Sequence, residues 1–137
     1  MFDFQNLNVY TKARDFNHEL QKVLDGHDLE EPSNTRLSES AFRIMLDVAR
    51  GTAPVSMKDR SVCFTEARAS VHACAAILDY LLTSDQFEQS TYDKLVEPLD
   101  ALSKMLYVLC RKTSEMPDKR PEAVSNGGVD KAEPVES

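Results

Sequence analysis

The sequence predicts an all-α protein, folded as an antiparallel up-down-up-down four-helix bundle with a disordered C-terminal tail. In the middle of the chain, small or apolar residues recur at steps of 3, 4, 3, 4 and 3; they are Phe64, Ala67, Val71, Cys74, Leu78 and Leu81. A stripe with this spacing stays on one side of an α-helix and interleaves with neighbouring helices. Three further segments repeat the pattern between polar connections, and 137 residues suit a single domain with one core.

The first helix is predicted over residues 7–24. Its apolar stripe consists of Val9, Tyr10, Ala13, Phe16, Leu20, Val23 and Leu24. Asn6 is placed to cap the N-terminus, and Gly26 stands where a glycine commonly ends a helix. The polar stretch 28–34, which contains Pro32, predicts a connection.

The second helix is predicted to begin at Ser33 or Asn34, either of which can cap it, and to end at Gly51. Its apolar stripe consists of Leu37, Ala41, Ile44, Met45 and Val48. We expect Gly51 to adopt the left-handed conformation that often ends a helix. Pro54 follows shortly and prevents continuation.

The third helix carries the central stripe and is predicted to run to about Leu82. Ser56 precedes it and is followed three residues later by Asp59. This pair resembles a capping box, with aspartate in the place that Glu or Gln usually takes. The cap and the stripe together predict one long helix.

The fourth helix is predicted to start at Ser90 or Thr91 and to end at Lys112. Its stripe consists of Leu95, Leu99, Leu102, Leu106 and Leu109. Pro98 lies within this pattern and cannot donate a hydrogen bond to the carbonyl oxygen of Lys94. Two alternatives stay open: the helix kinks at Pro98, or its first turn is a separate short piece.

The apolar periodicity stops after Lys112. We therefore divide the chain into a four-helix bundle domain, residues 1–112, and a disordered acidic tail, residues 113–137. The tail holds three basic and six acidic side chains and lacks an apolar repeat.

Composition restricts the classes of partner. The net charge of −7 argues against nonspecific nucleic-acid binding, because it repels the phosphate backbone. Apolar runs are far shorter than a membrane span, and residues 1–6 lack the basic and apolar regions of a secretory signal, so we expect a cytoplasmic protein without a membrane partner. The odd set of cysteines, Cys63, Cys74 and Cys110, matches no zinc or redox spacing and predicts core thiols.

The sequence offers no arrangement of catalytic residues. Its serines and cysteines stand beside no recognisable general base, and His18, His27 and His72 have no metal-ligand spacing. We therefore expect no enzymatic activity, no catalytic residue, no metal and no cofactor.

Three short segments carry a family resemblance. They are residues 7–13 (Leu-Asn-Val-Tyr-Thr-Lys-Ala), 47–51 (Asp-Val-Ala-Arg-Gly) and 64–70 (Phe-Thr-Glu-Ala-Arg-Ala-Ser). In this order they resemble the four-helix-bundle family of 23S rRNA intervening-sequence proteins, over roughly residues 4–112. This chain departs from the family pattern at Arg50, where the family has an acidic residue, and at Ala73, where it has a glutamate. Roles of those family carboxylates are therefore not carried over.

The resemblance implies a bacterial protein that has no established enzymatic activity and assembles into a ring-shaped homo-oligomer, a pentamer. A related bundle is an accessory protein of diversity-generating retroelements, in which a basic surface engages reverse transcriptase and nucleic acid. The resemblance thus supplies both an assembly hypothesis and a nucleic-acid hypothesis.

Three arginines form the first candidate site. Arg36, Arg43 and Arg50 recur every seven residues, so that successive members stand about 20° apart around the second helix. The functional interpretation is an interaction stripe that contacts phosphate or an acidic neighbouring subunit. The alternative is a solvated face with ion pairs from Glu39 to Arg43 and from Asp47 to Arg50.

Tyr80, Leu82 and Tyr107 form the second candidate site, a subunit interface, because they are apolar positions outside the main stripes. Taken together, the residues predict a non-catalytic oligomeric scaffold or protein-binding module. The alternative is a nucleic-acid-associated accessory protein that uses the arginine stripe. A protein partner is favoured over nucleic acid.

Overall fold

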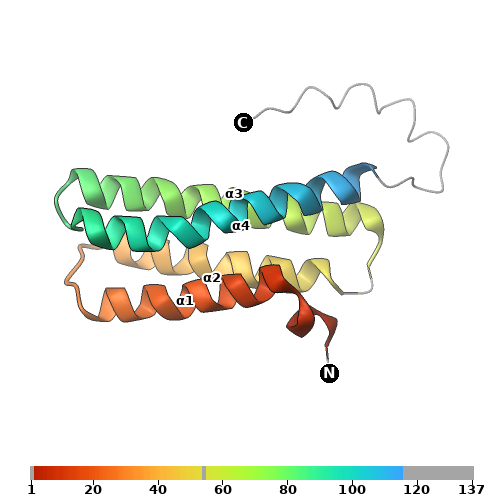
Figure 1. Cartoon of the computed structure of the whole chain (residues 1–137), viewed down its shortest axis with the longest axis horizontal. Helices are drawn as coiled ribbons and strands as arrows, with labels where there is room; N and C mark the ends of the chain where they lie inside the picture. Colours follow the sequence, from red (N-terminus) through yellow and green to blue (C-terminus); the bar gives the residue numbers. More distant parts are fainter. Residues whose placement is uncertain (1, 54, 116–137) are drawn as a thin grey trace.

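The computed structural model describes residues 2–53 and 55–115, and it is all-helical over this part of the chain. Its elements are the 3₁₀ helix η1 (Asp3–Asn6) and the α-helices α1 (Asn8–Asp25), α2 (Ser33–Gly51), α3 (Met57–Thr83) and α4 (Gln89–Glu115). Figure 1 shows the four α-helices side by side with alternating direction. α1 and α3 each pack against both α2 and α4, so the helices enclose one core. The predicted up-down-up-down bundle is confirmed.

The core is built from the stripes that the periodicity predicts. On α3, Phe64, Ala67, Val71, Cys74, Leu78 and Leu81 are all at most 3% exposed. The leucines of α4 join them, and four of the five, Leu95, Leu99, Leu102 and Leu106, are at most 1% exposed. Burying one such leucine contributes about 1.5–3 kcal/mol, so these stripes hold the bundle together.

Only one of the four helices begins at its predicted cap. The caps predicted for the second and fourth helices are wrong, because Ser33 and Asn34 lie within α2, whose N-cap is Pro32, and Ser90 and Thr91 lie within α4, which begins at Gln89. Ser56 caps α3, since its Oγ accepts a hydrogen bond from the backbone N–H of Asp59 at 3.1 Å. The predicted Asn6 cap is wrong. Asn6 belongs to η1, and the N-cap of α1 is Leu7, which makes no side-chain cap bond. η1 is instead held by an apolar contact, with the ring of Phe4 edge-on to Tyr10 at 4.7 Å.

Gly51 does not take the expected left-handed conformation. No glycine in the described residues has a positive φ, and Gly51 is the last helical residue of α2. A glycine stands here because a larger residue would not fit. A Cβ at Gly51 would lie 2.6 Å from Cε1 of Phe64, closer than side-chain carbons approach. A glycine here lets the end of α2 come against the Phe64 ring of α3.

α4 is one helix that contains Pro98, so the alternative of a separate first piece is wrong. It runs to Glu115, three residues beyond the predicted end at Lys112. Thr113 is only 9% exposed, and its Oγ1 donates to the carbonyl oxygen of Leu109 at 2.9 Å, so this extra turn belongs to the bundle. Two predicted features lie outside the described residues: Pro54, which follows α2, and residues 116–137 of the predicted tail.

Candidate functional site

The arginine stripe lies along the outside of α2. Arg36, Arg43 and Arg50 are all exposed. Arg50 donates from Nη1 to Oδ1 of Asp47 at 2.6 Å and lies 3.7 Å from Oε1 of Glu66 on α3. Within residues 2–53 and 55–115, no ion pair joins Arg36 or Arg43 to a carboxylate, and the predicted Glu39–Arg43 pair is not formed. The stripe therefore has one anchored arginine and two without a carboxylate partner.

Asp47 is buried, which the solvated-face interpretation of this helix did not anticipate. Its residue exposure is 2%, and its Oδ2 atom accepts no hydrogen bond. A buried carboxylate oxygen without a partner is costly, so the contact of Oδ1 with Arg50 is what keeps this group tolerable. In return, the hydrogen bond from Arg50 to Asp47 raises the pKa of the guanidinium. Asp47 thus fixes the position of Arg50 on the helix surface.

A shallow groove of about 730 Å³ opens beside this stripe, between α1 and α2. Its lining residues on α1 are Asn17, Leu20 and Gln21, and on α2 Ser38, Glu39, Ser40, Phe42, Arg43, Leu46, Asp47 and Arg50. Phe42 is 51% exposed and Leu46 is 47% exposed. Two large apolar side chains one turn apart therefore stand in water next to two arginines.

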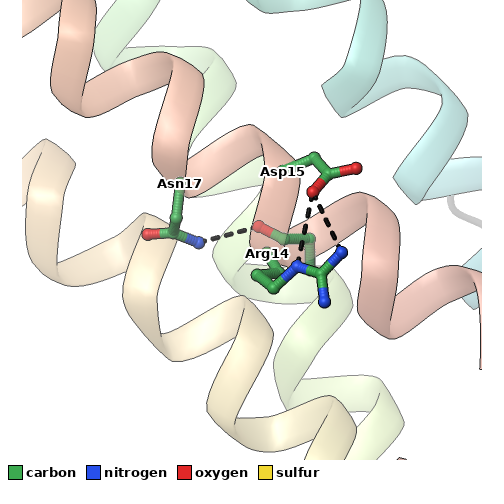
Figure 2. Close-up of polar contacts among 4 residues, drawn as sticks. Arg14, Asp15 and Asn17 are labelled. Atoms are coloured by element: carbon green, nitrogen blue, oxygen red, sulfur yellow. Dashed lines mark hydrogen bonds and ion pairs between the residues drawn. The ribbon is translucent and has the colours of Figure 1, made fainter. Parts of the chain in front are cut away.

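Asn17 fixes the two helices that border the groove. Its Nδ2 donates to the carbonyl oxygens of Ala13 at 2.9 Å and of Ala41 on α2 at 2.8 Å. Figure 2 shows the first of these bonds, with the ion pair of Arg14 and Asp15 on the same stretch of α1. A side-chain amide that lines the groove thus links the backbones of α1 and α2.

The predicted interface residues are not brought together. Tyr80 and Tyr107 are 53% and 46% exposed, whereas Leu82 is half-buried. The guanidinium of Arg68 lies 5.2 Å from the centre of the Tyr107 ring, so Tyr107 stands opposite Arg68 on α3. Tyr80 follows Arg68 by 12 residues, or about 18 Å along the helix. Leu82 points about 160° away from Tyr80 around α3.

Tyr80 instead belongs to a second stripe on α3, which the sequence reasoning missed. Its members are Val62, Ala69, Ala73, Ala76 and Tyr80, and all five are exposed. They are spaced at 7, 4, 3 and 4 residues, the same period as the core stripe. The sequence contains this spacing, so the stripe could have been predicted. It was missed because α3 is apolar on two sides and the core stripe is the more regular of the two. We call these residues the α3 outer stripe.

The remaining polar groups do not assemble a reaction centre in the described part of the chain. Cys63 and Cys74 are buried, Cys110 is half-buried, and all three are free thiols. Burial raises the pKa of Cys74 to about 12, so that thiol stays protonated and unreactive at neutral pH. No group of three His, Cys, Asp or Glu side chains among the described residues is placed to hold a metal ion.

His27 has a packing position rather than a ligand position. Its Nδ1 lies 2.8 Å from the carbonyl oxygen of Val23, and its ring is edge-on to Phe87 at 5.0 Å. A second open depression, about 580 Å³ between α1 and α4, is lined by Pro98 and Met105 together with residues such as Lys12 and Glu19. Thr11 also lines this depression, but no hydrogen bond among the described residues pairs its hydroxyl with the carboxylates of Asp15 or Glu19.

Comparison of the chain with protein-family models, with curated proteins and with solved structures finds no significant match. The resemblance to the intervening-sequence proteins therefore stays a prediction from the residues. None of the described helices is both long and apolar enough to cross a membrane.

Proposed function

We propose that the protein is a non-catalytic helical scaffold that assembles with copies of itself through the outer face of α3. The observation that carries this proposal is the α3 outer stripe. Along this side of α3, from Ala69 to Tyr80, apolar alanines replace the charged residues that normally cover a solvent-facing helix. An apolar stripe of this length is a surface that association would remove from water.

The residue types suit a helix as the neighbour. Alanine side chains let a second helix approach closely, and the period of the α3 outer stripe matches the knobs-into-holes packing of α-helices. Val62 and Tyr80 stand at the two ends, about 27 Å apart along the axis, and supply larger side chains that can anchor the contact.

The number of subunits rests on the family resemblance alone. That resemblance implies a bacterial protein that forms a ring-shaped pentamer, and a ring needs two different contact surfaces on each subunit. The α3 outer stripe is one surface. Tyr107 and Val108 on α4, which are 46% and 50% exposed, are the apolar residues available for the other.

The experiment is a mass measurement in solution by light scattering, across micromolar concentrations, on the full chain and two variants. Ala73→Glu places a charge in the centre of the α3 outer stripe and is expected to give a monomer with unchanged helicity. Val108→Glu, at an exposed apolar position on α4, tests the second surface and is also expected to give a monomer, because every contact in such a ring joins one surface of each kind. A monomeric wild-type protein contradicts the proposal.

A second candidate function has one observation in its favour. Arg36 and Arg43 are exposed and lack a carboxylate partner in the described residues, which is what a phosphate-binding stripe requires. The net charge of −7 opposes it. We therefore expect weak or no binding to RNA or DNA at about 0.15 M salt. Submicromolar, salt-sensitive binding that Arg43→Glu removes would support the accessory role instead.

A further inference from the structure

The outer side of α2 carries a combination of groups that self-association through α3 leaves unused. We call it the α2 face, and it consists of Arg36, Phe42, Arg43, Leu46 and Arg50. The two apolar residues are four apart and the three arginines are seven apart, so each set forms a line along the helix. The lines run side by side, with the groove against α1 next to them.

We propose that the α2 face binds an acidic amphipathic helix of a partner protein. The apolar side of that helix would cover Phe42 and Leu46, which are 51% and 47% exposed. Its carboxylates would meet Arg36 and Arg43, the two arginines that lack a carboxylate partner among the described residues. This is the helix-in-groove mode of recognition, in which apolar anchors supply affinity and flanking charges set orientation.

The dimensions support a helix as the occupant. From Arg36 to Arg50 the face extends over 14 residues, or about 21 Å at 1.5 Å per residue. A partner helix of about four turns covers that length. The groove of about 730 Å³ is open along this side, and the Asn17 amide links α1 to α2 beside it.

Charge complementarity selects an acidic partner. Arg50 is neutralised by Asp47 and Glu66, which leaves Arg36 and Arg43 against the single carboxylate of Glu39. The region is therefore weakly basic on a chain whose net charge is −7. A second copy of the same face would oppose arginine with arginine. Nucleic acid would contact the arginines and stack a base on the exposed ring of Phe42, but it would leave the apolar side chain of Leu46 in water.

Arg50 has a special place on this face because it is held there. Its bond to the buried Asp47 at 2.6 Å orders the guanidinium before any partner arrives. Ordering in advance lowers the entropic cost of binding. For the same reason Arg50 is a poor test position, since its removal would leave the Asp47 carboxylate buried without any partner.

The test uses a fluorescein-labelled helical peptide of about 18 residues, with leucines at i, i+4, i+7 and i+11 and glutamates beside them. A second peptide carries lysine in place of every glutamate. We expect the acidic peptide to bind the full chain with a Kd below about 1 mM, and the lysine peptide not to bind. The double variant Arg36→Glu with Arg43→Glu should weaken the acidic peptide about tenfold or more and gain affinity for the lysine peptide.

Matched controls separate a site from general electrostatics. Lys12→Glu with Lys22→Glu makes the same change of charge at two exposed positions of α1 and is expected to leave binding within about twofold. Phe42→Ser with Leu46→Ser should abolish binding while helicity is kept. The proposal is overturned if Lys12→Glu with Lys22→Glu weakens binding of the acidic peptide as much as Arg36→Glu with Arg43→Glu does. It is also overturned if the acidic peptide does not bind the full chain.

Two further outcomes identify another occupant and also overturn it. If a chain that ends at Glu115 binds the acidic peptide more tightly, and the free 116–137 peptide competes, the chain's own acidic segment covers the face. If RNA binds and Arg36→Glu with Arg43→Glu removes that binding, nucleic acid is the ligand. The proposal adds a partner to the scaffold but requires only a folded bundle, so a monomeric protein that binds the peptide refutes self-association and leaves this site standing.

Discussion

The outer faces of α2 and α3 differ in chemistry although the two helices lie side by side in the bundle (Figure 1). α2 presents arginines, one glutamate and two large apolar side chains, whereas α3 presents three alanines between Val62 and Tyr80. The first pattern fits a partner with its own charges, because ion pairs there add orientation. The second fits a close and uncharged neighbour. One bundle therefore offers two surfaces that compete little with each other.

The two sides of α3 also differ, since one is buried in the core and the other is exposed. A charge on the buried side is expected to have the largest effect on stability. Val71→Asp places a carboxylate at a position that is 2% exposed and without a partner. We expect the free energy of unfolding to fall by more than about 3 kcal/mol, measured by thermal or urea unfolding monitored by circular dichroism.

Its matched control is Ala73→Asp, two residues further on and on the α3 outer stripe. Because Ala73 is exposed, the stability of the isolated subunit should fall by less than about 1 kcal/mol, the size of the loss in helix propensity, while self-association is lost. Equal destabilisation by both substitutions would show that the two sides of α3 do not differ as described.

The contact between α2 and α3 is tested next at Gly51. Gly51→Val forces carbon atoms into the ring of Phe64, where even a Cβ would lie at 2.6 Å. We expect a loss of about 1–3 kcal/mol in unfolding free energy, typical of overpacking. Gly26→Ala is the control, because a Cβ there would lie 3.7 Å from the nearest atom, an ordinary contact. Adding Phe64→Leu to Gly51→Val should recover part of the loss.

A smaller effect is expected at the α1–α4 contact, away from both outer faces. Nζ of Lys94 lies 2.8 Å from Oε2 of Glu19, and this hydrogen bond lowers the pKa of the Glu19 carboxyl. A pKa lowered by folding contributes stability above the unfolded value of about 4.3, and that contribution is lost as pH falls through the folded value. Lys94→Met should therefore destabilise at neutral pH and converge with wild type in acid. An unchanged Glu19 pKa in the variant, measured by NMR titration, would contradict this.

The smallest effect is expected from removing the C-terminal segment. A chain that ends at Glu115 should keep its helicity, its number of subunits and both outer faces. A chain that ends at Lys112 should melt slightly lower, because it loses the turn in which Thr113 is 9% exposed and bonded to Leu109. If the shorter chain were as stable as the longer one, the end of α4 would not belong to the bundle.

The sequence was sufficient for the helices, because apolar periodicity records which side of each helix avoids water. The sequence also predicted the Ser56 cap, because that cap depends on a single hydrogen bond between one hydroxyl and one backbone N–H three residues away. It could not show that Asp47 is buried, because an i, i+3 ion pair looks alike on a solvated face and over a buried carboxylate. Nor could it assign Gly51, since a glycine at a helix end fits both a left-handed turn and a close approach, and only Phe64 distinguishes them.

The candidate sites were harder to predict than the fold for a related reason. Tyr80 and Tyr107 share a residue type, but Tyr107 stands opposite Arg68, which lies about 18 Å from Tyr80 along α3. The arginine spacing correctly placed three side chains on one line. Which of them is neutralised depends on Asp47 and Glu66, and Glu66 lies on a different helix.

The three thiols differ in burial, so their rates of chemical labelling would report local and global opening of the bundle. Cys110 is half-buried at the surface of α4, Cys63 is 6% exposed near the start of α3, and Cys74 is fully covered in its middle. A thiol reagent should therefore modify Cys110 from the native state and reach Cys63 when the end of α3 frays. It should reach Cys74 only when the whole core opens. The three labelling rates would give a map of local and global opening along one protein without a single engineered probe.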